Sequence, residues 1–476
     1  MDWTLKPSGQ FIAELGGVER IYRHVSRLLK VTGREHWGLY CCCRLELSLG
    51  LSDQATETKL QNAWLALRYE LPGLAVAITD DNKKSYNVPT TESVARWLEE
   101  TFIVEKTLNK DDILGSYPIK ESPTLYFLPE SLSMLLLVSH WRIDALGTCM
   151  LLNRFLALLA AGTCAPPLEE WPAAESQLAR ISPPIEDAIG SPSMKEAAQD
   201  PALEDFARQY IRHHHHTAVN AGGLPFKSAS AAERPSQTSL TLCRSGTSAF
   251  TKACRDCAIT ITSAVHAALA DIFFSVTPAA KQYACVMSVN MRNRLQAPYN
   301  LNSFQNAVQT YVTGVTPSVG RESSFLEKAR QLKEYYQHGW YSDEFARAMR
   351  LTTKYHADAM VNGPPPPAAG EAASPPTHRK PPSSVTLSSL GVVDRYIQQH
   401  HYNENSSESV TVTNFDFGVS MMTRQILLYV WTFDGHLRLS ANYNDAYHDA
   451  KEILELLNLI RKDLEKELAI VLDLDG

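Results

Sequence analysis

"LLLVSHWRIDALGTCMLLNRFLALLA" occupies residues 135–160 and places polar side chains between two apolar runs. The first run, Met134 to Val138, predicts a strand that is buried on both faces. The second run, Gly147 to Ala161, predicts a buried helix that Gly162 can end. His140 then follows a strand directly, at the edge of the core, where a side chain is held rigidly and can still reach a cavity.

Asp144 lies four residues after His140, in the turn before the predicted helix. Its carboxylate can fix this turn by bonding a basic partner or the helix N-terminus. A histidine with its ordinary pKa of about 6.5 can remove a proton from a hydroxyl. Gly147 permits a tight turn or a close backbone approach. A plain structural interpretation of both polar residues stays open here, because a chain with 15 histidines can contain one H-x-x-x-D pattern by chance.

Length and charge narrow the class of protein. A chain of 476 residues predicts two domains or one large two-lobed unit. The net charge of −7 argues against a general nucleic-acid binder, which needs a basic face. No apolar run reaches the roughly 18 residues that suggest a membrane span, and the first residues lack the pattern of a signal peptide. We therefore expect a cytoplasmic protein without membrane partners.

The cysteines and histidines do not predict a metal site. Cys41, Cys42 and Cys43 are adjacent on a predicted strand and point to alternate faces, so they cannot form a regular disulfide framework. The C-x-x-C at Cys254 lacks a second pair at zinc spacing. The side chains of residues 213–216, four adjacent histidines, point in different directions on a helix, and we expect a solvated tract.

The chain divides into three predicted parts. Residues 1–180 form an N-terminal lobe that carries the H-x-x-x-D motif, residues 181–237 form a crossover rich in Pro, Ser and Ala, and residues 238–476 form a C-terminal lobe. Strands and helices alternate in both lobes, which predicts an α/β fold. The segment "NGPPPPAAGEAASPPTHRKPPSS", residues 362–384, cannot build a core and is expected to be a disordered loop.

"HWRIDALG", residues 140–147, resembles the H-x-x-x-D-x-x-G signature of the superfamily that contains chloramphenicol acetyltransferase, peptide-synthetase condensation domains and BAHD acyltransferases. The similarity covers most of the chain, since four further segments resemble this superfamily in order and spacing: "KLQNAWLALRYELPGL", "TITSAVHAALADIFF", "VNMRNRLQAPYNLNSFQNAV" and "NFDFG". The opening "GGVERIYRHVSRLL" and the variant "DFGVS" are most similar to fungal trichothecene 15-O-acetyltransferases and their secondary-metabolite relatives.

The resemblance implies a fold and a mechanism. Two chloramphenicol-acetyltransferase-like lobes, each a mixed sheet with covering helices, are expected to meet around an active-site channel. His140 matches the general base that deprotonates an acceptor hydroxyl for direct attack on an acyl-CoA thioester. Asp144 matches a structural aspartate that pairs with Arg292, and Arg294 remains an alternative partner. Gly147 completes this structural part of the predicted site.

The resemblance also assigns residues to the channel. Asn306 matches an asparagine at the channel wall, and Asp416 and Gly418 match the motif that supports the channel from the second half. Val419 and Ser420 stand where the family has Trp-Gly, so any role of that tryptophan has no counterpart here.

Two functions remain open from the sequence. The first is an O-acyltransferase that moves an acetyl or other short acyl group from acyl-CoA to a hydroxyl of a small secondary metabolite, such as a trichothecene-like mycotoxin terpenoid. The second is a condensation-like domain that uses a carrier-protein-bound acyl donor or acts as a non-catalytic binding module. For the first, acetyl-CoA is a co-substrate, no cofactor is bound, and a monomer is expected.

Overall fold

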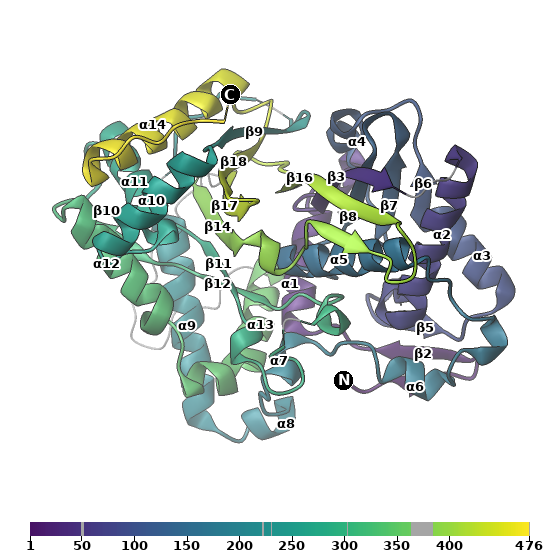
Figure 1. Cartoon of the computed structure of the whole chain (residues 1–476). Coiled ribbons are helices and arrows are strands. Elements are labelled where there is room, and N and C mark those ends of the chain that lie inside the picture. Colours follow the sequence, from purple (N-terminus) through teal and green to yellow (C-terminus); the bar gives the residue numbers. More distant parts are fainter. Residues whose placement is uncertain (49–51, 221–222, 230, 302, 363–383, 476) are drawn as a thin grey trace. The chain divides into compact units, whose positions relative to one another are not determined.

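The computed structural model describes residues 1–48, 52–220, 223–229, 231–301, 303–362 and 384–475 (Figure 1). Apart from its first and last residues, the loop predicted to be disordered at 362–384 lies outside the described residues. The chain groups into two compact units. The first unit contains Met1–Gly190, Met291–Tyr311 and Val393–Val419, and the second contains Ser191–Asn290, Val312–Val392 and Ser420–Gly476.

A six-stranded mixed sheet forms the centre of the first unit. Its order is β15 (His400–Tyr402), β16 (Ser409–Val419), β3 (Leu39–Ser48), β8 (Ser133–Val138), β7 (Thr124–Leu128) and β6 (Phe102–Val104). Among the described strands of this sheet, β6 and β7 are the one parallel pair. Every residue of β8 is buried, which confirms the predicted two-sided strand. The hairpin of β7 and β8 turns through Pro129–Ser131.

A smaller sheet and seven helices complete the described part of this unit. The small sheet has the order β1 (Thr4–Leu5), β2 (Gln10–Ala13), β5 (Lys84–Asn87) and β4 (Ala77–Ile78). The helices are α1 (Gly17–Arg27), α2 (Asp53–Glu70), α3 (Thr91–Thr101), α4 (Lys110–Ser116), α5 (Ala145–Ala161), α6 (Ala174–Leu178) and α7 (Ile185–Ala188). The apolar helix α5 packs against α2 and against strands β3 and β16. The left-handed Gly162 ends α5, as its sequence predicts.

The residues that make up the first unit do not follow the division predicted at residues 180 and 237. β16 comes from late in the chain, yet it pairs with β3 along almost its whole length. Residues 291–311 also belong to this unit. Strand pairing is a long-range interaction between backbones, so composition shifts along the chain do not reveal which sheet a late strand joins.

The second unit is built on another six-stranded mixed sheet and a two-stranded ribbon. The sheet has the order β12 (Val312–Val315), β11 (Met287–Asn290), β14 (Val385–Val392), β17 (Ile426–Phe433), β18 (His436–Asn444) and β9 (Pro235–Thr241). The ribbon pairs β10 (Gln282–Ala284) with β13 (Ser318–Gly320). Asp434 and Gly435 both have positive φ at the turn from β17 to β18, as expected for the predicted hairpin.

The helices of the second unit are α8 (Met194–Ala197), α9 (Pro201–Asn220), α10 (Arg244–Asp256), α11 (Ile261–Val276), α12 (Phe325–Glu334), α13 (Asp343–Asn362) and α14 (Ala450–Leu468). Helices α8 and α9 lie within the predicted crossover. On α9, His213 is exposed but His214 is buried near the ring of His356, so the prediction of a solvated tract is wrong at His214. Sheets combined with helices in both units confirm the predicted α/β class.

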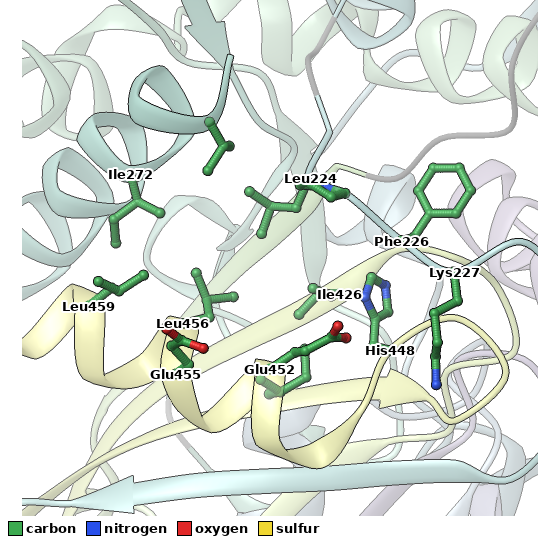
Figure 2. Close-up of a pocket in the computed structure, with 13 residues that line it drawn as sticks. Leu224, Phe226, Lys227, Ile272, Ile426, His448, Glu452, Glu455, Leu456 and Leu459 are labelled. Atoms are coloured by element: carbon green, nitrogen blue, oxygen red, sulfur yellow. The ribbon is translucent and has the colours of Figure 1, made fainter. Parts of the chain in front are cut away.

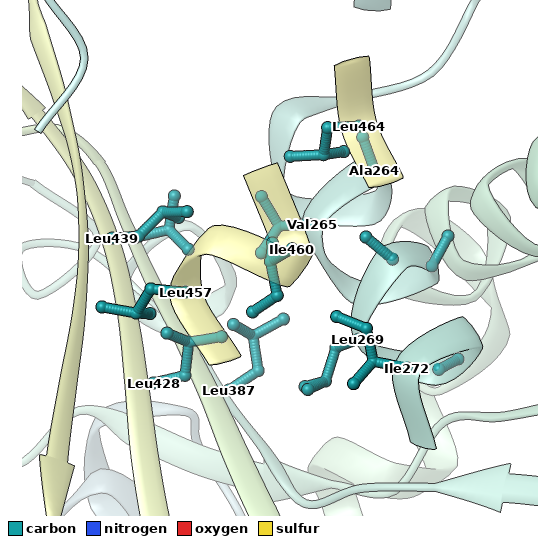
Figure 3. Packing of buried hydrophobic residues seen from close by; sticks show 14 of the residues in the cluster. Ala264, Val265, Leu269, Ile272, Leu387, Leu428, Leu439, Leu457, Ile460 and Leu464 are labelled. Atoms are coloured by element: carbon teal, nitrogen blue, oxygen red, sulfur yellow. The ribbon is translucent and has the colours of Figure 1, made fainter. Parts of the chain in front are cut away.

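Helices α11 and α14 supply much of the core of the second unit (Figure 3). Val265 and Leu269 on α11 belong to one apolar cluster with Leu457 and Ile460 on α14. Strands of the six-stranded sheet contribute further side chains such as Leu428. Among the described residues, no single helix has the length and apolar character to cross a membrane, and α10 with α11 satisfies both criteria only as a pair bent by 90°.

A pocket of about 420 Å³ opens beside the same two helices (Figure 2). Its walls are largely apolar, with Ile272 from α11 and Leu456 from α14, and Lys227 and His448 also line it. All of its lining residues belong to the second unit, so the pocket shares no residue with the H-x-x-x-D motif.

We expect Leu457→Ala to lower the free energy of unfolding by about 2–5 kcal/mol, because Leu457 is fully buried and truncation leaves a cavity. Leu454→Ala on the same helix is the matched control, since Leu454 is 43% exposed and should change stability by no more than about 0.5 kcal/mol. Urea unfolding followed by circular dichroism measures both. Equal effects of the two substitutions would contradict the packing of α14.

Candidate active site

His140 and Asp144 lie in the loop between β8 and α5, and all the predicted site residues belong to the first unit. Helix α5 begins at Ala145, two residues before the predicted start at Gly147. The reason is that Asp144 is itself the N-cap, and its Oδ1 accepts a 2.8 Å hydrogen bond from the backbone N–H of Gly147.

The Asp144 carboxylate joins three segments of the chain. Besides the helix start, it accepts a hydrogen bond of 2.8 Å at Oδ2 from the backbone N–H of Tyr311. Nη1 of Arg292 lies 3.1 Å from Oδ1 and 2.9 Å from Oδ2. Both charged side chains are only 1% exposed. The expected pair with Arg292 is therefore present, whereas Arg294 is exposed.

Additional hydrogen bonds to the carboxylate help to stabilise this buried pair. Taking a carboxylate and a guanidinium out of water costs several kcal/mol per ion, roughly, and good geometry with additional hydrogen bonds must repay that cost. Asp144 has backbone donors on both oxygens, and the guanidinium of Arg292 lies 5.4 Å from the ring centre of Tyr311. Removal of either partner would strand a buried charge.

Gly147 is required by a close backbone approach. A Cβ at this position would collide with the backbone carbonyl oxygen of Ala307, which cannot move away as a flexible side chain can. Ala307 follows the short helical turn Phe304–Asn306. The first turn of α5 and this later segment therefore pack in direct contact, which is one of the two roles predicted for Gly147.

One face of the His140 imidazole and the backbone carbonyl of His140 each contact another residue. The ring of Tyr22 on α1 stacks on it at a centroid distance of 3.9 Å and an interplanar angle of 22°. Thr310 Oγ1 donates a 2.5 Å hydrogen bond to the backbone carbonyl of His140. Nδ1 is buried and has no hydrogen-bond partner among the described residues.

Burial lowers the pKa of His140 to about 4, because the charged imidazolium is disfavoured away from water. The carbonyl of its own backbone and the charge of Asp144 raise the pKa, but by less than burial lowers it. His140 is therefore neutral at physiological pH, and its pKa lies well below the ordinary 6.5 that sequence alone suggests.

Arg142, between these two residues, anchors the loop. Its Nη1 donates to the carbonyl of Gly73 at 3.1 Å, and its Nη2 donates to the carbonyl of Glu121 at 2.7 Å. The guanidinium also lies 4.5 Å from the ring centre of Trp141. The polar residues inside the apolar stretch thus have different contacts. Asp144 bonds the helix start and Arg292, Arg142 bonds two backbone carbonyls, and the ring of His140 stacks on Tyr22.

The three residues predicted to line a channel have structural contacts. Asn306 Nδ2 donates to the carbonyl of Pro298 at 3.2 Å. Asp416 on β16 forms an ion pair of 2.5 Å with Lys110. Gly418 lies two residues further along β16, beside β3. A channel role for Asn306, Asp416 and Gly418 stays a prediction.

Three contacts of the site were not predicted from the sequence. Tyr22 lies in the segment "GGVERIYRHVSRLL", which carries part of the family resemblance, but nothing in that segment indicates stacking on His140. Thr310 and Tyr311 act through a hydroxyl and a backbone N–H, which have no sequence signature. Among the described residues, no group of three or more His, Cys, Asp or Glu side chains could hold a metal ion.

We expect Arg292→Ala to destabilise the chain by about 3–5 kcal/mol, the range for a buried pair that loses one partner. Asp144→Ala should cost about 1 kcal/mol more, because it also removes a helix cap. The double mutant should cost clearly less than the sum of the two. Lys59→Ala is the control, since its pair with Glu408 is partly exposed and worth no more than about 1 kcal/mol. Additivity within about 0.5 kcal/mol in urea unfolding would contradict the pairing.

Comparison with known proteins identifies relatives over the whole chain, although no family model matches. The chain is 39% identical to "O-acetyltransferase pigM" of Monascus ruber, covering 99% of this chain and 88% of that protein. It is 35% identical to "Azaphilone biosynthesis cluster protein M" of Aspergillus terreus, covering 98% of this chain and 97% of that protein.

Solved structures show the fold. The TRI3 trichothecene 15-O-acetyltransferase from Fusarium sporotrichioides matches with a TM-score of 0.78 at 18% identity, over 98% of this chain and 97% of that chain. The first condensation domain of the calcium-dependent antibiotic synthetase matches with a TM-score of 0.62 at 14% identity, over 98% and 99% of the two chains. These matches confirm the two-lobed fold of chloramphenicol-acetyltransferase-like and condensation proteins. With its full-length relatives, this chain belongs to a fungal family of secondary-metabolism O-acetyltransferases.

Proposed function

We propose that this enzyme transfers an acetyl group from acetyl-CoA to a hydroxyl of an azaphilone-type metabolite, with His140 as the general base. The observation that carries the proposal is a neutral, buried imidazole at the end of a rigid strand, stacked on Tyr22 and followed by a loop locked at Asp144. A neutral imidazole can accept a proton, and a fixed one needs no reorganisation before it does so.

The reaction needs only one proton acceptor from the protein. The hydroxyl of the alcohol gives its proton to His140 while the oxygen forms a bond to the carbonyl carbon of the thioester. The C–S bond then breaks, and the departing sulfur takes the proton back from the imidazolium. The products are an acetate ester and free CoA thiol, and the imidazole is neutral again.

The two ring nitrogens of His140 have different environments. Nδ1 is buried, and the backbone of His140 itself interacts with the imidazole, so we assign the ring proton to Nδ1. The lone pair on Nε2 is then the acceptor for the alcohol proton. Asp144 does not act on the substrate in this mechanism, because both of its oxygens are occupied by Arg292 and by backbone donors.

The relatives guide the choice of acceptor. The protein of Aspergillus terreus is named for azaphilone biosynthesis and is 35% identical to this chain. The trichothecene enzyme shares only 18% identity and therefore supports the fold alone. For this reason we favour an azaphilone-type alcohol over the trichothecene-like terpenoid that the sequence resemblance suggests.

The test is an incubation of the purified chain with acetyl-CoA and two sets of alcohols, azaphilones and trichothecenes. Release of free thiol and mass spectrometry of the ester measure transfer. A parallel reaction with an acetyl-loaded carrier protein tests the alternative donor of condensation domains. Turnover with the carrier protein but not with acetyl-CoA would overturn the proposed donor, and exclusive acetylation of trichothecenes would overturn the proposed acceptor.

We expect His140→Ala to lower kcat by about 10²- to 10⁴-fold, the usual contribution of a general base. The fold should persist, because the residue lies at the end of β8 and contributes no ion pair to it. His338→Ala is the matched control, since the His338 side chain is 70% exposed on the second unit and should leave turnover unchanged. A His140→Ala variant with native circular dichroism and turnover like the wild type would overturn the base assignment.

We expect the acid limb of the kcat/KM profile to have its midpoint at about pH 4, because the pKa of His140 is lowered to about 4 by burial. Protonation below that pH removes the lone pair that accepts the alcohol proton. His140 also binds its proton more tightly in the unfolded chain, so its contribution to stability declines as the pH falls from about 6.5 to about 4. Rates are therefore measured only where near-UV circular dichroism remains native. A midpoint near 6.5 would contradict a desolvated base.

A further inference from the structure

A second buried carboxyl group lies beside the catalytic loop. Glu35 precedes β3 and is 1% exposed. Ser139, the residue immediately before His140, is 5% exposed and donates a short hydrogen bond from its Oγ to Oε1 of Glu35. This bond connects residues 104 positions apart, and the mechanism uses neither side chain directly.

Glu35 also takes part in a clamp across the ends of two strands. Its backbone N–H donates to the carbonyl of Tyr117 at 3.3 Å. The hydroxyl of Tyr117 donates to the carbonyl of Leu39, at the start of β3, and lies 3.3 Å from the carbonyl of Val138, at the end of β8. The strand end from which the catalytic loop departs is therefore held from outside the sheet.

The charge environment of Glu35 suits a neutral acid. Among the described residues, Glu35 has no ion-pair partner, although Arg23 and Arg27 on α1 and the carboxylate of Glu121 affect its pKa from a distance. Burial raises its pKa to about 7, and the bond from Ser139 lowers it by less than burial raises it. In either protonation state the oxygen Oε1 can accept the Ser139 hydroxyl, and a glutamine amide oxygen at this position could do the same.

We propose that Glu35 is a positioning residue that sets the place of the His140 imidazole through its hydrogen bond with Ser139. This inference rests on the proposed function, in which His140 is the base. On the other side of the loop, Thr310 holds the carbonyl of His140 and Tyr22 covers its ring. The hydrogen bond from the Ser139 hydroxyl to Glu35 holds the loop next to β8. Loss of this bond would let the loop shift at the point where it leaves the strand.

A small shift of this kind has a large kinetic effect. A misplacement of about 1 Å in a catalytic group can cost about a hundredfold in rate, since the reacting atoms must be close and aligned. In the proposed mechanism, acetyl-CoA does not use the lone pair of His140, and the alcohol makes only one hydrogen bond to it. The loss is therefore expected in kcat, with KM values close to those of the wild type.

The experiment compares four variants of Glu35 and Ser139 with one control in the full-length chain. We expect Glu35→Ala and Ser139→Ala each to lower kcat by about a hundredfold, with KM for both substrates changed by less than about twofold. Glu35→Gln should restore most of the rate, because its amide oxygen can accept the Ser139 hydroxyl. The Glu35→Ala, Ser139→Ala double mutant should be no slower than the slower single variant, because both changes break one bond.

Thr101→Ala is the matched control. Thr101 is also 1% exposed in the first unit, and its hydroxyl bonds the indole N–H of Trp64 and the carbonyl of Trp97, away from the catalytic loop. It should lower the melting temperature without changing kcat. If Glu35 had only a general structural role, Glu35→Ala would behave like Thr101→Ala, with a lower melting temperature and an unchanged kcat.

The outcomes separate this inference from the proposed function. Wild-type kcat in folded Glu35→Ala and Ser139→Ala would overturn the positioning role while His140→Ala remained inactive. A Glu35→Gln variant as slow as Glu35→Ala would also overturn it, because the hydrogen-bond acceptor would not be what matters. If Glu35→Ala does not fold, Ser139→Ala and Glu35→Gln decide the question. Full activity of His140→Ala would instead refute the proposed base.

Discussion

The buried carboxylate of Asp144 is the constraint on which the rest of the loop between β8 and α5 depends. A charge with 1% exposure must be matched by donors, and here they come from the start of α5, from Tyr311 and from Arg292. Because these donors belong to segments that are far apart in sequence, satisfying one side chain also fixes where residues 291–311 pack. The collision that a side chain at Gly147 would cause with Ala307 shows how tightly that segment lies against the helix.

In this arrangement the buried charge and the proposed general base are two different residues, Asp144 and His140. Asp144 carries the charge and is fully engaged, whereas His140 is neutral and has one ring face against Tyr22. Burial keeps the imidazole in its proton-accepting form, although the same burial makes it a weaker base than a solvated histidine. In the proposed mechanism, Tyr117 and the carboxyl of Glu35 offset that weakness, because they hold the proposed base in one place at the strand end.

The comparisons with known proteins agree with a structure in which a few contacts are fixed and the rest of the fold tolerates many substitutions. Solved structures keep this fold at 14–18% identity, because sheets and helices need only the correct apolar pattern and approximate volume. Substrate choice depends on loops and pockets that vary over the same frame. Fold resemblance alone therefore says little about which alcohol is acetylated, and the full-length relatives at 35–39% identity are the better guide.

Periodicity and local turn chemistry in the sequence predicted β8, α5 and its Gly162 end, and the hairpin at Asp434, because each depends on neighbouring residues. Family resemblance added the pairing of Asp144 with Arg292. The tertiary structure alone decided that β16 joins the sheet of β3, that burial lowers the pKa of His140, and that Tyr22 and Glu35 lie at the catalytic loop. These features depend on contacts between residues tens to hundreds of positions apart and on exclusion from water, and neither is encoded in a local pattern.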